Sequence, residues 1–282
     1  MARQWECVAI VGVGLIGASI GQALLRRGLA KRVVGIARRQ TTLRAARRVE
    51  AVTNTTIDPL KGVAEADLVV VCTPPDTVVD LVRRTAEHAP EGTLFTDVAS
   101  TKAKIAAALD GSLPRGCRFL GSHPLAGSEK TGPSYSDPNL FEGRVAVLTP
   151  TSHTNADDFD VLEAFWSSLG SVVIQMAPEE HDRALAETSH FPHLLAALLA
   201  GMLPEPYFRL TGTGFLDTTR VAAGDVEMWT QICMQNRRYL LEVCRKFGER
   251  LRHLAAALEK GDAPAVQQIL TLGKKNRDAL GS

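Results

Sequence analysis

The chain has 282 residues, of which 45% are hydrophobic and 22% are charged, and its formal net charge is +1 at pH 7. A chain of this length is sufficient for two domains with separate hydrophobic cores. Because the positive and negative charges almost balance, composition provides no electrostatic argument for a nucleic-acid partner or for an anionic membrane surface.

Neither the cysteines nor the N-terminal residues indicate secretion. The five cysteines are odd in number and scattered, which predicts reduced thiols rather than a disulfide framework or a zinc site. The first six residues lack the hydrophobic region of a signal peptide, and no apolar run reaches the length of a transmembrane helix. We therefore expect a cytoplasmic protein without a membrane or nucleic-acid partner.

A glycine motif dominates the N-terminal stretch CVAIVGVGLIGASIG. An apolar run predicts a buried strand, and the G-x-G-x-x-G of Gly12, Gly14 and Gly17 follows it directly. Gly12 permits a tight turn, Gly14 lets the backbone approach a pyrophosphate, and Gly17 lets the following helix pack closely on the strand. The helix is expected to begin near Leu15, so Leu15 and Ile16 join the predicted dinucleotide site at its N-terminus. The alternative is a glycine-rich turn in another kind of α/β protein.

The first half of the chain alternates strand and helix patterns, as a doubly wound parallel sheet does. After the glycine motif, strands are predicted at 32–37, 67–72, 93–98 and 118–121, and helices at 42–49 and 102–109. The segments 139–147 and 171–176 are expected to complete this sheet, with an amphipathic helix at 157–169 between them. The predicted fold class is therefore α/β, with a Rossmann-type sheet in the N-terminal part.

From Pro178 onward the patterns are helical only, and long apolar faces appear. We therefore expect a Rossmann-type dinucleotide-binding domain over residues 1–177 and an all-helical C-terminal domain over residues 178–282. Two of its helices are predicted at 229–258 and 263–280, separated by the turn EKGD. Their apolar faces exceed what one sheet domain would cover.

The end of the second strand predicts which dinucleotide binds. An NAD-selective site is expected to have an acidic residue there, about 20 residues beyond the glycines, which accepts hydrogen bonds from the ribose hydroxyls. The chain instead has Ala37 followed by Arg38, Arg39 and, at the start of the next helix, Thr42. Guanidinium groups and hydroxyls suit a 2′-phosphate, so we assign these three residues to the cofactor site and predict NADP over NAD. Alternatively the arginines are solvated charges, and the protein takes NAD or either cofactor.

Two further strands deliver polar residues to the edge of the sheet where ligands bind. Thr73 and Pro74 follow the strand at 67–72, at the carboxyl edge, and are assigned to the cofactor site. Ser100 emerges on the same edge after the strand at 93–98. The structural alternative for Ser100 is the N-cap of the helix at 102–109.

His123 follows the short apolar run at 118–121 and precedes a proline in the stretch SHPLAGSEKTG. An imidazole held at the end of a strand among glycines and small polar residues suits a general base on the ligand edge. A lone histidine is more often structural, so both interpretations stay open on this pattern alone.

The motifs GVGLIGASIG, DVAST, SHPLAGSEKTG, NLFEGRVAVLTPT, SHFPH and GFLDTTR occur in this order along nearly the whole chain. Together they resemble the prephenate/arogenate dehydrogenase family of tyrosine biosynthesis, and the HPxAG and SHxPH elements are more discriminating than the glycine motif. The resemblance implies an NAD(P)-dependent oxidative decarboxylation of a cyclohexadienol. Hydride leaves the ring carbon that bears the hydroxyl, a base takes the hydroxyl proton, and the opposite carboxylate departs as CO2 because the product is aromatic.

The resemblance implies a role for each matched polar residue. His123 would be the base, and the hydroxyl of Ser100 would orient it. Arg220 of GFLDTTR would clamp a substrate carboxylate, since only a planar fork pairs with both oxygens at once. The structural alternative for this arginine is a salt bridge to Asp217 or Asp225.

The SHFPH element is expected to line the substrate site through Ser189, His190 and His193. The two histidines are three residues apart and share a helix face. Metal binding is the other interpretation of such a pair, but no acidic or cysteine partner completes a ligand set, and this chemistry needs no Lewis acid. We therefore predict no metal site. The structural alternative is a helix that is capped or kinked around Pro192.

Three more features bear on substrate access and assembly. Glu129, assigned to the substrate site, and Lys130 are expected to gate the entrance. Leu216 stands where family members often have a basic residue, so the choice between prephenate and arogenate cannot be carried over. The helical domain resembles the family's dimerisation domain, which implies a homodimer with the active site in the cleft between domains; intramolecular packing of the apolar faces is the alternative.

Two other functions stay open. A reductase of the β-hydroxyacid or pyrroline-carboxylate kind has the same plan of domains, but the first of these classes relies on a lysine in the helical domain, and none lies between Lys130 and Lys246. A non-catalytic NADP-binding sensor would keep the fold, yet it has no need of His123, Ser100 and Arg220 together.

Overall fold

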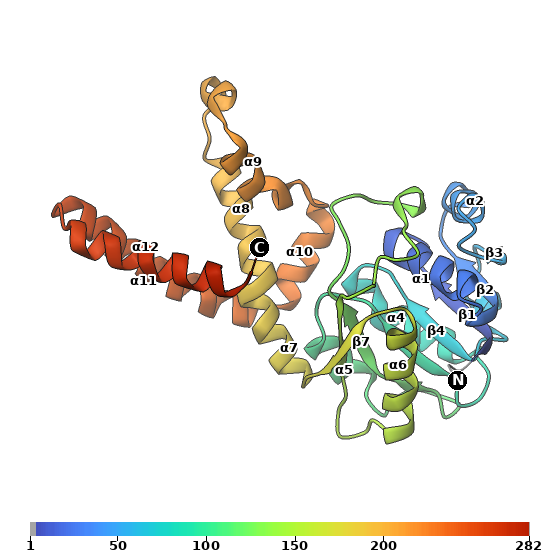
Figure 1. Cartoon of the computed structure of the whole chain (residues 1–282). Coiled ribbons are helices and arrows are strands. Elements are labelled where there is room, and N and C mark those ends of the chain that lie inside the picture. The colour runs from blue at the N-terminus through green and yellow to red at the C-terminus, as the bar shows by residue number, and fades with distance from the viewer. Residues whose placement is uncertain (1–3, 282) are drawn as a thin grey trace. The chain divides into compact units, whose positions relative to one another are not determined.

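The computed structural model describes residues 4–281 of the chain (Figure 1). The chain forms two compact units, which we call the first unit (Met1–Asn236) and the second unit (Arg237–Ser282). The predicted site residues all belong to the first unit.

A six-stranded parallel sheet with strand order β3-β2-β1-β4-β5-β6 forms the centre of the first unit. Its strands are β1 (Trp5–Val11), β2 (Ala30–Ile36), β3 (Asn54–Thr56), β4 (Leu68–Val71), β5 (Leu94–Asp97) and β6 (Arg118–Phe119). The helices that alternate with them are α1 (Leu15–Arg26), α2 (Gln40–Arg48), α3 (Pro59–Val63), α4 (Pro75–Ala86) and α5 (Ala103–Leu109). The strand order reverses between β1 and β4, which is where ligands of open α/β sheets bind. The predicted Rossmann-type fold class is confirmed.

The central strand β1 shows why the sheet needs helices on both faces. Val8 and Ile10 pack into one hydrophobic cluster, and Ala9 and Val11 into another. All four are buried, as is typical of a parallel strand covered on both sides. The apolar run that predicted this strand therefore reflects two cores rather than one.

The prediction that residues 139–147 and 171–176 complete the first sheet is wrong. Instead β7 (Gly121–Pro124), β8 (Val145–Thr149) and β9 (Val172–Gln175) form a second, three-stranded sheet, with β7 antiparallel to β8 and β8 parallel to β9. The chain leaves the first sheet at Leu120, whose N–H still donates to Phe95 O (3.0 Å), and then pairs with β8. Strand patterns predict that a segment is extended, but not which neighbour it pairs with.

The predicted amphipathic helix after β8 is α6 (Ala156–Ser168). Its Leu162, Phe165 and Trp166 join the same hydrophobic cluster as Val8 and Ile10 of β1. The helix therefore covers one face of the first sheet and helps to bury β1. Between β7 and β8 lies a short 3₁₀ turn, η1 (Pro133–Tyr135).

Within residues 4–281, every element from Pro178 onward is helical, as predicted. Those of the first unit are α7 (Pro178–Leu185), the π-helical turn η2 (Ala186–His190), α8 (Phe191–Gly201), the 3₁₀ turn η3 (Glu205–Leu210), α9 (Thr213–Thr219), the 3₁₀ turn η4 (Arg220–Ala223) and α10 (Val226–Gln235). The π-helical turn leads directly into α8, whose second residue, Pro192, has no N–H to donate to the preceding turn. These helices belong to the same compact unit as the sheets, so the domain boundary after Ala177 stays a prediction.

The predicted single helix at 229–258 is wrong, because the helix is interrupted at Asn236. This residue leaves helical geometry (φ −98°, ψ 18°), and its side-chain amide donates a hydrogen bond to Asp182 O (2.7 Å). The second unit then consists of α11 (Arg237–Glu259) and α12 (Ala263–Ala279), joined by the predicted turn with Gly261 at φ 65°.

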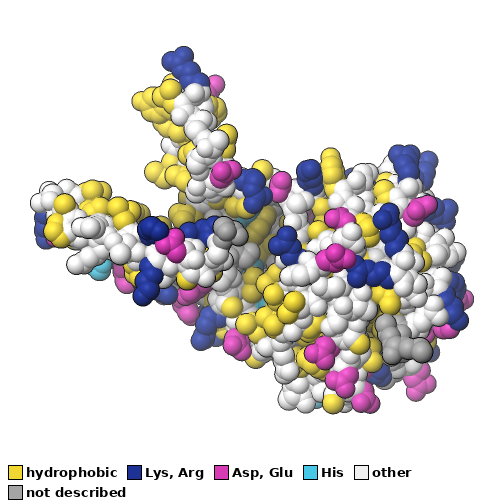
Figure 2. Space-filling view, in the orientation of Figure 1, with side chains coloured by type: hydrophobic (Ala, Val, Ile, Leu, Met, Phe, Trp, Pro, Cys, Tyr) yellow, Lys and Arg dark blue, Asp and Glu magenta, His cyan; other side chains and the backbone are white. Residues whose placement is uncertain are grey.

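Apolar side chains are exposed on both units. In the first unit they gather on α8, η3 and α9, where Figure 2 shows a largely hydrophobic surface. Its exposed members are Leu198, Leu199, Met202, Tyr207, Phe208, Leu210 and Leu216, and we call them the α8–α9 patch. In the second unit the exposed apolar residues include Leu241, Leu251, Leu258, Ile269, Leu270 and Leu272.

Within residues 4–281, no helix has both the length and the apolar character needed to cross a membrane.

Candidate active site

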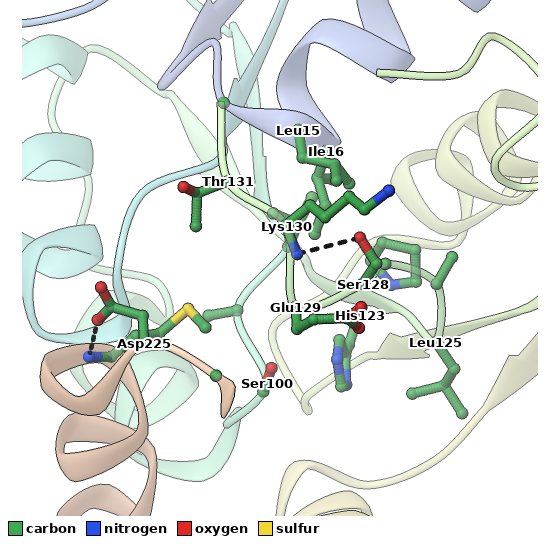
Figure 3. A pocket seen from close by; sticks show the side chains of 18 of the residues that line it. Leu15, Ile16, Ser100, His123, Leu125, Ser128, Glu129, Lys130, Thr131 and Asp225 are labelled. Carbon is green, nitrogen blue, oxygen red and sulfur yellow. Dashed lines mark hydrogen bonds between the residues drawn. The ribbon is translucent and has the colours of Figure 1, made fainter. Parts of the chain in front are cut away.

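A cavity of about 980 Å³ opens at the carboxyl ends of β1, β4 and β5, within the first unit. Figure 3 shows part of its lining, which includes Leu15 and Ile16 at the α1 N-terminus, His123 on β7 and residues 128–131 of the loop after β7. The predicted site residues that line it are Gly14, Leu15, Ile16, Thr73, Pro74, Ser100, His123, Glu129, Ser189, His193 and Arg220. Most of the candidate site therefore lies in one place, although its residues come from segments far apart in the chain.

The three glycines of the motif differ in what a side chain would meet at each position. Gly12 has φ +100°, and a Cβ on it would lie 2.5 Å from Cys72 O. A Cβ on Gly17 would lie 2.2 Å from Gly12 O, so only glycine lets α1 pack this closely on the turn. A Cβ on Gly14, by contrast, would meet no described atom within 4 Å. The position that faces the predicted pyrophosphate is therefore open space.

The N-terminus of α1 fits an anionic group. The N-cap residue Gly14 makes no side-chain hydrogen bond, and the first helical bond is donated by Ala18 N to Gly14 O (2.9 Å). Leu15 and Ile16, whose N–H groups precede this bond, line the cavity. Free N–H groups and the positive end of the helix dipole suit a phosphate. The residues present therefore fit the pyrophosphate of a dinucleotide.

Arg38 and Arg39 follow β2 and Thr42 lies on α2, and none of the three lines the cavity around His123. Their strand is held at the turn, because Gly12 N donates to Ile36 O (2.8 Å). Both arginines are exposed, and neither guanidinium group has a hydrogen bond or an ion pair within residues 4–281. They are therefore available to an anionic group that extends from the turn.

His123 lies on β7 and is 8% exposed. Its Nδ1 is 2.9 Å from Nε2 of the buried His181, and Nδ1 of His181 is in turn 2.9 Å from Oδ1 of Asp182. Burial lowers the pKa of His123 well below its ordinary value of 6.5, with further lowering from His181 and Lys102. A neutral imidazole that borders the cavity is ready to accept a proton at neutral pH.

Ser100 lines the same cavity but does not hold His123. The Nδ1 atom of His123 is bonded to His181, and no hydrogen bond joins Ser100 to His123 in the structure. The N-cap alternative for Ser100 is also wrong, because Lys102 occupies that position. The N–H groups of Lys102 and Ala103 instead donate to the Asp182 carboxylate (2.8 and 3.0 Å). A residue of α7 thus caps α5 across the fold.

The two histidines of SHFPH have different environments. The His193 ring stacks on Trp229 (centroids 3.5 Å apart, planes at 12°), and its Nδ1 atom has no hydrogen-bond partner among the described residues. The His190 ring is fully buried, with Nδ1 2.9 Å from Asn236 Nδ2, and does not line the cavity. Burial lowers its pKa to about 4. The predicted substrate residue His190 therefore does not line the cavity. Its ring is instead buried against Asn236 and Trp229.

The ion-pair partner of Arg220 is a residue that the sequence did not predict. Its guanidinium lies 3.1 Å from the carboxylate of Glu129 in the loop after β7. The alternative partners Asp217 and Asp225 are wrong; Asp225 instead caps α10 by accepting a hydrogen bond from Met228 N (2.8 Å). The ion pair is solvent-accessible, so it contributes little to stability.

Of the two remaining residues with an expected effect on the entrance, Lys130 and Leu216, the cavity lining includes Lys130 but not Leu216. Lys130 lines the cavity with its ammonium 5.3 Å from the centroid of the Tyr135 ring. Leu216 on α9 is 57% exposed and does not line the cavity. A missing basic residue at this position therefore leaves the described cavity wall unchanged.

Sequence reasoning missed three residues of the site, namely His181, Asp182 and Trp229. His181 and Asp182 lie in PEEHDRAL, which carries no catalytic motif. The spacing gives only a weak indication that His181 is buried, because His181 and Leu185 are four residues apart and share the buried face of α7.

Within residues 4–281, no group of three or more potential ligands is placed to hold a metal ion.

A parallel sheet with a glycine turn at its switch point, an open helix N-terminus and a neutral histidine in one cavity defines the class: a dinucleotide-binding dehydrogenase. Two family models match, one described as the nucleotide-binding domain of prephenate dehydrogenase (residues 20–175) and one as its dimerization domain (residues 177–272). The chain belongs to the prephenate dehydrogenase family.

Similar proteins span nearly the whole chain. It is 30% identical to prephenate dehydrogenase of Bacillus subtilis over 99% of this chain and 77% of that protein. It is 31% identical to cyclohexadienyl dehydrogenase of Zymomonas mobilis over 97% of this chain and 95% of that protein. The crystal structure of prephenate dehydrogenase from A. aeolicus in complex with hydroxyphenyl propionate and NAD+ has a TM-score of 0.90 and 28% identity, and covers 99% of this chain and 100% of that one.

Proposed function

We propose that this chain oxidises and decarboxylates prephenate or arogenate with hydride transfer to NAD(P), giving 4-hydroxyphenylpyruvate or tyrosine. The observation that carries the proposal is that His123, Arg220 and the open N-terminus of α1 border one cavity. A base, a carboxylate-binding group and a dinucleotide site are the three parts that this reaction needs. The names of the related proteins support the same reaction.

In the proposed mechanism, the free nitrogen of His123 accepts the proton of the substrate hydroxyl. The ring carbon that bears this hydroxyl loses hydride, and the bond to the ring carboxylate then breaks, with its electrons completing the aromatic ring. Arg220 holds a substrate carboxylate by exchanging its bond to Glu129 for one to the substrate. Ser100, Ser189 and His193 border the same space and are proposed to contact the substrate.

When bound, the nicotinamide cofactor supplies the hydride acceptor. The residues that would hold it are Gly14, Leu15 and Ile16 at the pyrophosphate, with Thr73 and Pro74 along the neighbouring strand end. For the 2′-phosphate we infer that Arg38, Arg39 and Thr42 provide the contacts, and hence that NADP is preferred over NAD. The unpaired guanidinium groups that follow β2 support this preference.

The test of the cofactor preference is Arg38→Ala, measured by the Kd of NADP and of NAD. Loss of a charge-assisted contact to the phosphate should weaken NADP by about 10- to 100-fold and leave NAD within about twofold. Equal weakening of both dinucleotides would contradict the assignment. Arg83→Ala, an exposed arginine on α4 whose guanidinium bonds Ala108 O, is the matched control.

The test of the reaction is steady-state reduction of NADP and NAD by the purified protein, with prephenate and arogenate supplied separately. Turnover in any pairing supports the proposal, and the four kcat/KM values give both preferences. His123→Asn should lower kcat by about 10²- to 10⁴-fold while the Kd of the cofactor stays within twofold. Absence of turnover with all four pairings, while a dinucleotide still binds, would contradict the proposed reaction.

We further propose that the chain is a homodimer. The α8–α9 patch supports this, because an apolar surface of this extent is unusual on a monomer. Light scattering should give a mass of twice the 30.4 kDa of one chain. Phe208→Asp combined with Leu210→Asp should shift the mass toward one chain, while Ile57→Asp, at an exposed residue away from the patch, should not. A monomeric wild-type protein would contradict the proposal.

A further inference from the structure

Three side chains form a continuous buried hydrogen-bond chain that ends at the cavity. It runs from His123 Nδ1 to His181 Nε2 (2.9 Å), and from His181 Nδ1 to Asp182 Oδ1 (2.9 Å). His181 is 0% exposed and Asp182 2%, so solvent does not compete for these bonds. The carboxylate is itself held by the backbone N–H groups of Lys102 (2.8 Å) and Ala103 (3.0 Å).

The order of these bonds determines where each ring carries its hydrogen. An ionised carboxylate can only accept hydrogen bonds, so the atom of His181 that faces Asp182 has to be Nδ1–H. A neutral His181 then has a lone pair on Nε2, which can only accept from His123. The hydrogen of a neutral His123 is therefore on Nδ1, and its Nε2 carries the lone pair.

We propose that His181 and Asp182 are positioning residues that hold His123 as the Nδ1–H tautomer, so that Nε2 is the base facing the cavity. The identity of the hydroxyl that Nε2 deprotonates rests on the proposed function. The tautomer itself does not, because it follows from the hydrogen bonds within the protein. A group that hydrogen-bonds the far nitrogen of an imidazole sets the tautomer and the orientation of that ring.

The charged groups around the two rings are compatible with both of them being neutral. Lys102 Nζ is paired with the Asp97 carboxylate and donates to Ser122 O (2.9 Å), so this lysine and aspartate form a buried pair. Burial lowers the pKa of His123 and of His181, and Lys102 lowers both further, whereas Asp182 raises that of His181. His190 also lowers the pKa of His123. One hydrogen on each ring is therefore the expected state at neutral pH.

The chain of bonds also acts once the base has taken up a proton. The imidazolium of His123 still donates through Nδ1 to His181, and the negative charge of Asp182 lies at the end of the chain. The same carboxylate caps α5, directly after the loop that carries Ser100, so it positions two sides of the cavity at once. The bond between Asn236 Nδ2 and Asp182 O (2.7 Å) holds this part of α7 in place.

The direct test is the tautomer of His123, read from nitrogen NMR of protein labelled with ¹⁵N-histidine at pH 7.5, with His123→Asn providing the assignment. We expect His123 with hydrogen on Nδ1 and a lone pair on Nε2 in the wild-type protein. Hydrogen on Nε2, or an exchanging mixture of tautomers, would overturn the proposal whatever the enzyme turns over. This measurement needs neither substrate nor a variant of His181, so it is independent of the proposed reaction.

A kinetic test uses His181→Phe and His181→Gln. The phenyl ring removes both hydrogen bonds, so kcat should fall by about 10- to 100-fold, while KM and the Kd of the cofactor stay within about twofold. Glutamine can accept from His123 through its oxygen and donate to Asp182 through its amide, so it should recover at least a third of the lost kcat and keep the Nδ1–H signature.

Each kinetic outcome has a defined meaning. Circular dichroism and cofactor binding establish that each variant is folded, and the exposed His88→Gln is the matched control. A folded His181→Phe with wild-type kcat would overturn the positioning role. If neither prephenate nor arogenate is turned over by the wild type, the proposed function fails, while the wild-type NMR result still decides the tautomer.

Discussion

The Arg220 guanidinium lies 3.1 Å from the Glu129 carboxylate, although the two residues are 91 positions apart in the chain. Both residues line the cavity, and the arginine side chain is 61% exposed. A substrate carboxylate that binds Arg220 therefore competes with a carboxylate of the protein. The exposed pair is weak enough to be exchanged, since such pairs typically contribute about 0–1 kcal/mol.

Substitutions at the two ends of this pair should have opposite effects. Arg220→Gln removes a charge-assisted contact, so KM for the substrate should rise by about 10- to 100-fold while kcat changes much less. Glu129→Gln removes the competing carboxylate, so KM should fall by up to about fivefold. Steady-state kinetics at constant ionic strength measure both. A rise in KM for Glu129→Gln would show that the glutamate binds substrate directly.

Alanine at two of the motif glycines should separate binding from folding. Gly14→Ala places a methyl group in open space at φ −79°, so the protein should keep its Tm and lose about 10-fold or more in dinucleotide affinity. Gly17→Ala places a methyl 2.2 Å from Gly12 O, so unfolding free energy should fall by about 1–3 kcal/mol. Thermal unfolding without cofactor and titration calorimetry distinguish the two. A lower Tm for Gly14→Ala would contradict the expected open space.

The pH dependence of kcat/KM should show a base that stays neutral well into the acidic range. The base has to be unprotonated to act, and burial lowers the pKa of His123 well below 6.5. We therefore expect kcat/KM to be independent of pH from about 6.5 to 8, and to fall only at lower pH. An acidic limb centred at or above pH 6.5 would contradict the assignment of His123 as a buried base.

Stability should also decline below neutral pH. Burial lowers the pKa values of His123, His181, His190 and His193, so the unfolded chain binds protons that the native protein does not. The contribution of these neutral histidines to the free energy of unfolding is therefore fully present above pH 6.5. It is lost as the pH falls toward the native pKa values, by up to about 1.4 kcal/mol per pH unit for each histidine.

The histidine contribution can be isolated with one variant. The native pKa of His190 is about 4, so replacing it with Asn should reduce the pH dependence of the unfolding free energy between pH 4 and 6.5. Urea unfolding across this range measures the slope. His88→Gln, at an exposed position, should leave it unchanged. An unchanged slope for a folded His190→Asn would show that this imidazole is not neutral in the native protein.

Gly224 is expected to set the position of the aromatic wall. A Cβ at this residue would lie 2.6 Å from Trp229 Nε1 and 3.1 Å from His193 Cε1. Gly224→Ala should therefore shift the stacked pair and raise KM for the substrate by about 10-fold, with the Kd of the cofactor unchanged. Gly212→Ala, which meets no described atom within 4 Å, is the control. Normal KM for Gly224→Ala would show that the stack does not contact the substrate.

The sequence alone predicted the features that depend on neighbouring residues. The glycine turn, the alternation of strands and helices, and the helical C-terminal part all follow from local periodicity and turn chemistry. His123 was also identified in this way, because its strand end and following proline are local features. The resemblance to a known family added Arg220 and the SHFPH element for the same reason, since both are short motifs.

Only the tertiary structure decided which distant residues meet. His181 lies 58 positions after His123, and nothing in either local segment shows that Nδ1 of His123 lies 2.9 Å from Nε2 of His181. The pairing of Arg220 with Glu129 and the second sheet around β8 are of the same kind. Local patterns determine which backbone geometry a segment adopts, whereas contacts between distant segments depend on how the whole core packs. The candidate base was therefore predicted from the sequence, and the two residues that we propose orient it were not.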